Sequence, residues 1–597
     1  MNTTQSFLVA RWIRDDILPT DTETNTYQSY QQTIADLDRC VAQFELLRSS
    51  LDKSLSSEAV LQAIRDFETI TTFIKRLSGY AELWIAEDTQ NPHAQACATL
   101  IDIVITKATN KTLFFPLWWK NLPEDVAASI LGDIPQYAYW LRQMRSAVIH
   151  TLPEPVEQAI NLKNSTGVTA LRALYDAITS RYSFTLEADG QIHHLTDSGI
   201  WGYASHPDPA VRDRAFVELY RVYSQDASLL GRIYFTLVQD WYQEYIELRR
   251  YSSPLAVRNQ MNDIPDALIE TLFRVCRTNT PLFHRYFRLK ARWLGMERMR
   301  RCDLAAPIIT KKQSYTWKQA VEMTLATFES FDPLFYQLAH RIFQANHVDS
   351  EVRSGKRRGC WCLDFGPTIT PWVQIDFNGR VDDIAALIHE FGHAIHGMLA
   401  EHQSVLQYAP SIPLAEVGAL FCELLFADHL LQQTHDPEVR IGLRFKQLND
   451  SFAFLHRQIY FTFFECTAHD LIQQGASIDD VAQAYLDTVR EEFGDTIDIP
   501  DAMRWEWTLI FHLFHYPFYM YSYAFGQLLA LALYQQYRQE GNSFKDRFFE
   551  ILRAGSSDHP VAILSKAGVN IADPLFWQGG YDVIQIMLED IEQIPIP

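Results

Sequence analysis

Apolar and polar residues follow a helical pattern along most of this 597-residue chain, as amphipathic helices that bury one face require. Residues 26–145 form a first series of such segments, broken near Pro92, Pro116 and Pro123. Helical patterns dominate again from residue 206 onward, except around residues 355–379. We therefore predict a mainly α fold with an N-terminal helical region, residues 1–200, and a larger domain, residues 201–597.

Two short regions carry the patterns of β-strands. Residues 184–186 and 192–195 flank Asp189-Gly190, a pair that favours the tight turn of a hairpin. Residues 371–377 predict a strand, and Asn378-Gly379 predicts a turn after it. An apolar run over residues 381–399 then predicts a helix, which Asp382 or Asp383 can cap.

That helix carries a pair of histidines with the spacing of a metal site. His389 and His393 lie one helical turn apart, and Glu390 stands next to the first. Side chains four residues apart share a helix face and are separated by roughly 6 Å along the axis, so both imidazoles can bind one ion. Two imidazole ligands beside a carboxylate that takes a proton from metal-bound water are typical of zinc metallopeptidases. The alternative is a buried helix whose histidines bond to backbone or carboxylate groups.

A third ligand must come from elsewhere, because Leu399 stands where the metzincin pattern has a further histidine. The candidates are Glu401, Glu416 and Glu423, of which we expect Glu401 to belong to the turn that leaves the helix. Glu416 and Glu423 lie seven residues apart on one face of an apolar segment, residues 415–425, where buried acids are costly unless a cation meets them. We predict Glu416 as the third ligand and Glu423 as a residue that supports the ligands. The alternative is a solvated helix face.

A second group of polar and aromatic residues lies within residues 507–526. His512, Tyr516, Tyr519 and Tyr523 have the spacing of one helical face, although Pro517 must bend or begin the helix. An imidazole and several phenols suit a peptidase, whose tetrahedral intermediate carries an oxyanion that needs hydrogen-bond donors. The alternative is an aromatic stripe that belongs to the core.

Several blocks of the sequence, in this order, resemble the oligoendopeptidase F branch of the thimet oligopeptidase family. They are Gly355–Cys360, Trp372–Gly379, Asp382-Asp383, His389–His396, Ala415-Glu416-Val417, and His512 with Pro517–Gly526. Weaker similarities begin earlier, so that the resemblance spans about residue 80 to the end.

The resemblance implies a zinc endopeptidase that cleaves short peptides in a deep central channel between two mainly helical lobes. It also implies that residues 201–597 are the catalytic domain, with a small β-sheet beside the zinc helix, residues 381–399. The strand over residues 372–377 would then pair with the substrate backbone through an exposed edge.

The resemblance also assigns roles to individual residues. The ligands of the single zinc ion (Zn2+) map onto His389, His393 and Glu416. The catalytic glutamate maps onto Glu390, and the donors on the oxyanion side map onto His512 and Tyr519 or Tyr523.

The chain departs from the family pattern beside the metal ligands. Gly418-Ala419-Leu420 replaces the usual Ala-Ser-Thr after the ligand glutamate, which bears on substrate preference more than on the reaction. Ala524-Phe525-Gly526 stands where the family has Ala-Thr-Gly. Cys360 and Cys362 add two thiols near the cleft, which we interpret as packing or oxidation-sensitive residues.

Composition favours a cytoplasmic enzyme that acts on peptides. A net charge of −21 argues against nucleic acids and anionic membranes as partners. Eight cysteines form no disulfide framework, and the N-terminus lacks the apolar stretch of a signal peptide. The basic run Lys356-Arg357-Arg358 predicts a mobile loop, or a clamp on the substrate or its C-terminal carboxylate.

Two other function classes stay open at this point. One is a metallo-carboxypeptidase or aminopeptidase built on the same zinc helix, and the other is a helical peptide-binding protein that has lost its chemistry. The sequence does not indicate an oligomeric state.

Overall fold

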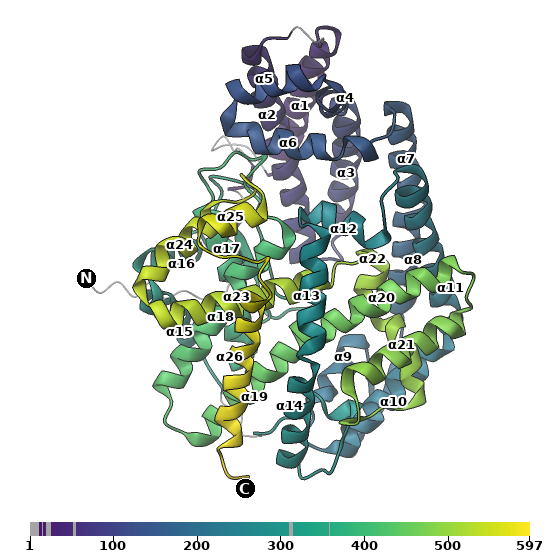
Figure 1. Cartoon of the computed structure of the whole chain (residues 1–597), viewed down its shortest axis with the longest axis vertical. Coiled ribbons are helices and arrows are strands. Elements are labelled where there is room, and N and C mark those ends of the chain that lie inside the picture. The colour runs from purple at the N-terminus through teal and green to yellow at the C-terminus, as the bar shows by residue number, and fades with distance from the viewer. Residues whose placement is uncertain are drawn as a thin grey trace. The chain divides into compact units, whose positions relative to one another are not determined.

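Helices make up nearly all of the regular structure, which confirms the predicted mainly α fold (Figure 1). The computed structural model describes residues 11–14, 16–18, 26–51, 55–309, 314–357 and 359–596. Its contacts divide the chain into two compact units. Unit 1 comprises Met1–Glu154, Lys312–His429 and Gln536–Asn570; unit 2 comprises Pro155–Lys311, Leu430–Gln535 and Ile571–Pro597. The predicted division at residue 200 and the channel between two lobes stay predictions.

The N-terminal part of unit 1 is a group of six helices whose breaks follow the prolines. They are α1 (Thr26–Leu46), α2 (Ser57–Glu87), α3 (Pro92–Thr112), α4 (Phe114–Asn121), α5 (Glu124–Asp133) and α6 (Ala138–Ser146). Pro92 begins α3, where the Asn91 side chain accepts the backbone N–H of His93. Pro123 directly precedes α5, and Pro116 lies in the first turn of α4, where its missing N–H leaves no hydrogen bond unmade.

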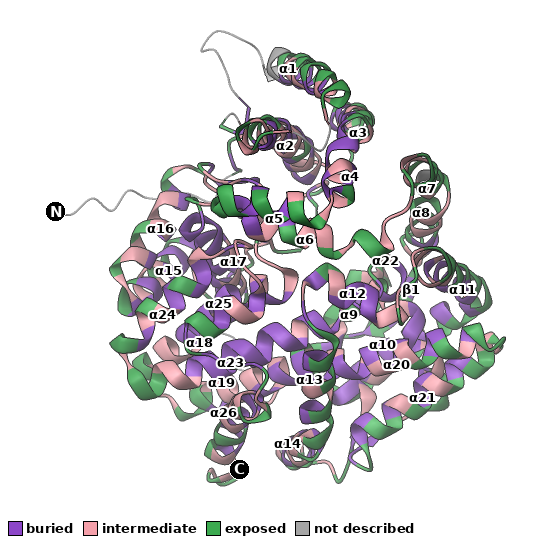
Figure 2. Ribbon diagram, turned by 45° about the horizontal axis from the view of Figure 1, so that its top comes forward, coloured by how far each residue is buried: buried purple, intermediate pink, exposed green. Residues whose placement is uncertain are grey.

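The rest of unit 1 is built around α17 (Val381–Leu399), whose bounds are those predicted. Its further helices are α15 (Trp317–Phe331), α16 (Pro333–Gln344), α24 (Asn542–Arg553), α25 (Pro560–Lys566) and most of α18 (Ile412–Gln433). Helices α15, α16 and α24 pack on α17, which is mostly buried (Figure 2). At its start, the Asp383 carboxylate accepts the backbone N–H groups of Asn378 and Arg380 at 2.7 and 3.0 Å, as expected of a capping acid.

A small β-sheet lies beside α17, as predicted, but its strand order differs from the expectation. The strands β4 (Val348–Asp349), β6 (Trp372–Gln374) and β5 (Trp361–Leu363) lie in that order. Strand β6 is therefore central, parallel to β4 and antiparallel to β5, and its backbone is paired on both sides. The prediction that this strand offers an exposed edge is wrong, because the pattern of one strand does not reveal its neighbours. Strands β4 and β5 form the two edges of the sheet, and β5 also packs on α17.

The basic run that precedes β5 is anchored. The Lys356 ammonium is 2% exposed and is ion-paired with Asp349 and Asp376 at 3.1 and 3.2 Å. It also donates hydrogen bonds to the backbone carbonyls of Asp349, Glu351 and Ile375. The prediction of a mobile loop or substrate clamp is wrong for Lys356, because this cation satisfies buried acceptors of the sheet. Arg358 lies outside the described residues.

Unit 2 is also mainly helical. Its helices are α7 (Glu154–Thr166), α8 (Val168–Thr179), α9 (Asp197–Trp201), α10 (Pro209–Gln225), α11 (Ala227–Trp241), α12 (Pro254–Asn262), α13 (Asp266–Thr278), α14 (Thr280–Trp293), α19 (Pro437–Ser451), α20 (Arg457–Gln473), α21 (Ile478–Phe493), α22 (Phe511–His515), most of α23 (Tyr521–Glu540) and α26 (Pro574–Glu592). A π-helical turn, Tyr242–Leu248, follows α11. Strands β3 (Met299–Arg300) and β7 (Ile497–Asp498) pair in parallel.

The predicted hairpin is present in unit 2. Strand β1 (Phe184–Ala188) pairs with β2 (Gln191–Leu195) in antiparallel register. Asp189 and Gly190 form the turn with φ of 52° and 76°, the left-handed values that this pair of residues tolerates. Nowhere in the described ranges does a helix combine the length and the apolar composition needed to cross a membrane.

Candidate metal centre

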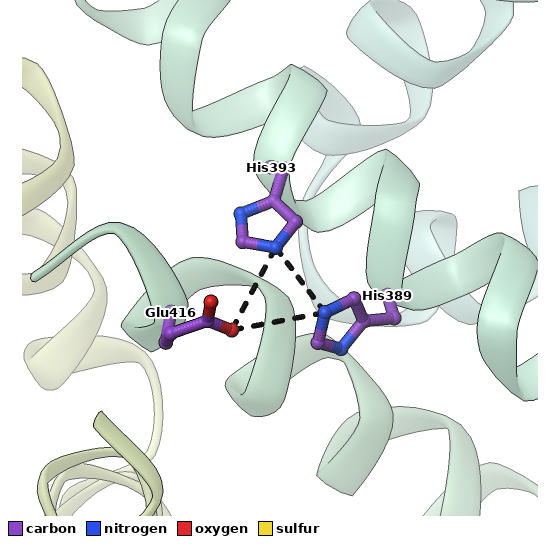
Figure 3. Close-up of side chains that lie close together, drawn as sticks. All are labelled: His389, His393 and Glu416. Atoms are coloured by element: carbon purple, nitrogen blue, oxygen red, sulfur yellow. Dashed lines mark hydrogen bonds and ion pairs between the residues drawn. The ribbon is translucent and has the colours of Figure 1, made fainter. Parts of the chain in front are cut away.

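Two helices of unit 1 bring His389, His393 and Glu416 together (Figure 3). The two imidazoles come from α17, and their Nε2 atoms lie 3.2 Å apart. The carboxylate comes from α18, with its Oε2 at 3.8 Å from Nε2 of His389 and 3.7 Å from Nε2 of His393. Within the described part of the chain, this is the one group of three or more potential ligands whose donor atoms converge on a metal-sized space.

The donor set fits a zinc ion. Tetrahedral zinc with ligands at about 2.0–2.1 Å holds its donor atoms roughly 3.4 Å apart, close to the three distances in this group. Two imidazole nitrogens and one carboxylate oxygen leave a fourth position for water or substrate. The surroundings favour a cation, because burial raises the pKa of Glu416, and Glu423 raises it further, although His389 acts to lower it; a bound cation would stabilise the charged carboxylate.

Glu423 lies behind the first histidine. Its Oε1 is 2.5 Å from Nδ1 of His389, so that the Nε2 atom of the same ring points toward Glu416. Burial acts to lower the pKa of His389, but this hydrogen bond and the nearby carboxylates outweigh it and raise the pKa to about 10. A carboxylate on the far nitrogen of a histidine is the usual way to orient a metal ligand. The structure thus places Glu423 where the sequence predicted a supporting residue.

Glu401, the acid that was a candidate but not the predicted third ligand, lies outside this group. Glu401 follows α17 in the turn that the sequence predicted, and it forms an ion pair with Arg341 at 3.1 Å.

Two glycines allow the helices α17 and α18 to approach closely enough to share the site. A Cβ atom at Gly392 would lie 2.5 Å from the Cα atom of Ala419 and 2.9 Å from the carbonyl oxygen of Gly418. At Gly418 a Cβ would lie 3.3 Å from the carbonyl oxygen of Gly392. Gly418-Ala419, which departs from the family pattern, therefore lies at a contact between two backbones.

Glu390 is held between α17 and the sheet. The side chain is 6% exposed, and its carboxylate accepts the backbone N–H of Cys362 from strand β5. The sequence does not reveal this donor, because every residue type except proline carries a main-chain N–H. Cys362 is half-buried, and burial raises the pKa of its thiol, which disfavours the reactive thiolate and supports a packing role; Cys360 is exposed, so the packing interpretation does not extend to it.

The residue after β5 joins the sheet to α17. Asp364 accepts a hydrogen bond of 2.6 Å from the Tyr408 hydroxyl. A Cβ at Gly397 would lie only 1.9 Å from the same carboxylate, so the helix backbone contacts Asp364 directly. Strand β5, and with it the donor to Glu390, is thereby set against the metal-binding helix.

The residues of the second predicted group lie together in unit 2, but not on one helix. Helix α22 ends at His515 and α23 begins at Tyr521, so the expectation of a single helical face is wrong. Pro517 has no N–H, and Phe518 has a left-handed φ of 55°, which turns the chain between the two helices.

This turn brings the predicted side chains together. The Tyr523 hydroxyl lies 3.3 Å from Nε2 of His512, and the His512 and Tyr519 rings stack with centroids 5.7 Å apart. The Tyr516 ring lies beside them, 5.8 Å from that of Tyr519, and is 48% exposed. Burial lowers the pKa of His512, which favours the neutral imidazole.

Buried polar residues hold this turn, and no motif in the sequence revealed them. The Arg258 Nε donates to the carbonyl oxygen of Pro517 at 2.9 Å, and the Glu465 carboxylate accepts the N–H of Phe518 at 2.9 Å. The Asn262 amide donates to the Tyr521 hydroxyl at 2.8 Å. Such support lets a strained, left-handed Phe518 persist.

Comparison with known proteins relates the chain to a family of peptidases. Residues 203–582 match the family model described as Peptidase family M3, and residues 118–184 match that described as Oligopeptidase F. Oligopeptidase PepF of Bacillus subtilis is 23% identical over 595 residues, which cover 98% of this chain and 87% of that protein. Group B oligopeptidase PepB of Streptococcus agalactiae is 23% identical over 550 residues, 90% of either chain.

Solved structures share the fold. Oligoendopeptidase-F from Enterococcus faecium superimposes with a TM-score of 0.74 at 21% identity, over 95% of this chain and 99% of that one. PZ peptidase A, solved with an inhibitor, gives a TM-score of 0.76 at 16% identity, over 94% and 98%. At identities this low, the structural similarity establishes a shared fold and nothing more.

Proposed function

Because the chain belongs to peptidase family M3 and is a metalloendopeptidase, we propose that it is a zinc-dependent oligoendopeptidase that hydrolyses internal bonds of short peptides. The observation that carries this proposal is the convergence of His389, His393 and Glu416, with donor atoms 3.2 to 3.8 Å apart and Glu390 on the same helix. In the proposal the two histidines and Glu416 hold one zinc ion. When bound there, zinc supplies Lewis-acid chemistry, which polarises a carbonyl and makes water acidic near neutral pH.

The proton transfers fall to Glu390. As the unligated carboxylate next to His389, it would accept a proton from the attacking water and return it to the leaving amine. The N–H of Cys362 holds the carboxylate in one orientation, so the proton is taken and delivered from a fixed position.

The oxyanion donors of the proposal are His512 and Tyr519 or Tyr523. The Tyr523 hydroxyl and His512 Nε2 are within 3.3 Å, which supports a cluster that presents donors together. Burial keeps the imidazole neutral, so one of its nitrogens carries a proton that it can share in a hydrogen bond.

Recognition of the peptide would use main-chain hydrogen bonds. Among the residues that the structure describes, strand β5 has no strand neighbour on its outer side, where the N–H of Cys362 reaches Glu390. We assign to β5 the pairing with substrate backbone that the sequence suggested for β6, which implies tolerance of many side chains. A cytoplasmic location belongs to the proposal, since all eight cysteines are free thiols.

The test is cleavage of an internally quenched peptide blocked at both ends, by the zinc-loaded full chain. We expect cleavage that a chelator abolishes and added zinc restores. Glu390→Gln should keep zinc and lose about 10²–10⁴-fold in turnover, as removal of a general base does. Glu401→Gln, which removes a charge just after α17 but outside the metal group, serves as the matched control and should retain activity.

Two results would contradict the proposal. Comparable turnover by Glu390→Gln would remove this residue from the chemistry. Cleavage of free peptides but not of blocked ones would identify an exopeptidase, and zinc binding without cleavage of either would indicate a peptide-binding protein.

A further inference from the structure

We propose that Arg258 and Arg172 of unit 2 form a binding site for a carboxylate group of the bound peptide, next to Tyr516 and Tyr519. The inference rests on the proposed function in one respect: the ligand is the peptide substrate. It adds a chemical feature that this substrate must carry and assigns two residues to its recognition.

Arg258, on helix α12, is a buried cation without an acidic partner. It is only 9% exposed, and its Nε atom donates to the Pro517 carbonyl oxygen at 2.9 Å. In the described chain no acid lies within ion-pair distance of this residue, and its two terminal nitrogens make no hydrogen bond. A guanidinium desolvated in this way is stabilised by an anion that brings its own charge.

Glu465 is the acid that acts most strongly on the charge of Arg258, but it does not neutralise it. Glu465, on α20, is fully buried and uses one oxygen to accept the Phe518 N–H, while its other oxygen has no partner. Burial raises the pKa of Glu465 to about 8, so the neutral acid predominates at pH 7. The positive charge of Arg258 therefore stays uncompensated.

Arg172 adds a second cation from helix α8. One turn later on the same helix, Asp176 lies 2.9 Å from Nε2 of His515, and the Tyr175 ring stacks on Phe514 at 3.9 Å. These contacts seat α8, and with it Arg172, against α22, the helix that ends directly before Tyr516.

Arg172 also lacks a counter-ion. Its Nε atom is buried without a hydrogen-bond partner, and no ion pair of this residue occurs in the described ranges. Asp240 acts on it from beyond ion-pair distance, and burial lowers the pKa of Arg172 despite that acid. Arg258 donates to the carbonyl oxygen of Pro517, the residue after Tyr516, and α8, which carries Arg172, packs on α22 just before Tyr516, so both arginines belong to elements that contact the same turn.

The site adjoins the proposed oxyanion donors. The Tyr516 ring is 5.8 Å from that of Tyr519 and 6.4 Å from that of His512. Tyr516 and Phe511 are 48% and 43% exposed, so an accessible aromatic surface leads from the donors to the cations. In a chain with a net charge of −21, two unpaired guanidiniums at one place select for an anion.

A carboxylate is the anion that every short peptide supplies. The planar fork of arginine matches it with paired hydrogen bonds. The C-terminal carboxylate or an Asp or Glu side chain has the same chemistry. If the C-terminus is the ligand, cleavage occurs at a constant number of residues from the end of the peptide.

The experiment measures Kd by fluorescence anisotropy on the zinc-loaded full chain carrying Glu390→Gln, which prevents turnover. Three labelled peptides share one core: a free C-terminal acid, its amide, and an amide with an internal glutamate. We expect the free acid to bind about ten-fold more tightly than the plain amide, the effect of one charged hydrogen bond. A glutamate amide that matches the free acid identifies a side-chain carboxylate as an equivalent ligand.

Variants then locate the site. Arg172→Met should bring the Kd values for acid and amide close together and leave the amide Kd unchanged, which shows that the fold persists. Arg258→Lys keeps a donor for the Pro517 carbonyl and should reduce the preference. Arg232→Met, an exposed arginine on α11, is the matched control for loss of charge and should preserve it.

Equal Kd values for all three peptides, or an equal loss of preference in Arg232→Met, would overturn the inference. The proposed function fails separately. A chain that prefers the acid but never cleaves the blocked peptide loses the peptidase proposal and keeps the site, whereas active cleavage without the preference loses only the site.

Discussion

Gly392 is the point at which α17 meets the backbone of α18, so Gly392→Ala should disturb the metal centre without replacing a ligand. The added Cβ would lie 2.5 Å from the Cα atom of Ala419 and 2.9 Å from the carbonyl oxygen of Gly418. Carbon atoms in contact lie about 3.5–4.0 Å apart. Since both obstacles are backbone atoms, the helices must separate by about 1 Å.

That separation acts directly on the ligands. His389 and His393 flank Gly392 on α17, and Glu416 lies one turn before Ala419 on α18. Metal–ligand distances tolerate changes of only about 0.2 Å. We expect the zinc Kd to rise about 100-fold, equivalent to about 2.7 kcal/mol, and the free energy of unfolding to fall by about 1–3 kcal/mol from overpacking.

The assay is competition for zinc with a chromophoric chelator, together with urea unfolding of the zinc-free chain. Gly132→Ala is the matched control, because a Cβ at this helical position meets no atom within 4 Å. That control should bind zinc normally and gain up to about 1 kcal/mol from helix propensity. If Gly392→Ala binds zinc as tightly as the parent chain, the helix contact does not position Glu416 and the reasoning fails.

Three further predictions concern buried charges. Glu423→Ala should weaken zinc binding by about 10–100-fold, because His389 loses the carboxylate that orients it; unchanged affinity in the same competition assay would exclude that role. The folded pKa of Glu465, about 8, lies above its unfolded value of about 4.3, so the free energy of unfolding should fall as pH rises from about 4.5 to about 8. Glu465→Gln lacks this loss, so urea midpoints of the two chains should diverge over that range, and parallel profiles would refute the assignment. Lys356→Met should lower the free energy of unfolding by about 3–5 kcal/mol, since Asp349 loses a buried cation; a loss below about 1 kcal/mol in urea unfolding would favour the mobile loop.

The proposed carboxylate site lies in a different part of the chain from the one that the sequence suggested. The sequence offered Lys356 and its neighbours as a clamp on the substrate terminus, but Lys356 is committed to the carbonyls and acids around the sheet. Arg258 and Arg172 lie in no basic run, and their sequence context is unremarkable. Each combines burial with the absence of an acidic partner in the described fold, and both conditions depend on what packs around the guanidinium.

Local spacing alone was enough to predict much of this protein. The bounds of α17, the shared face of His389 and His393, the paired acids Glu416 and Glu423, and the Asp189-Gly190 hairpin all follow from the period of a helix or the dihedral angles of a turn. These are properties of neighbouring residues, so they can be read before any long-range contact is known.

Packing between distant segments settled the rest. The place of β6 in the middle of its sheet, the burial of Lys356, the donor from Cys362 to Glu390, and the turn at Phe518 each depend on segments far apart in the chain. The same holds for the distance between α17 and α18, where two glycines let backbones touch. Residue identity shows that a glycine has no side chain, but only the folded chain shows which atoms occupy the space that this leaves.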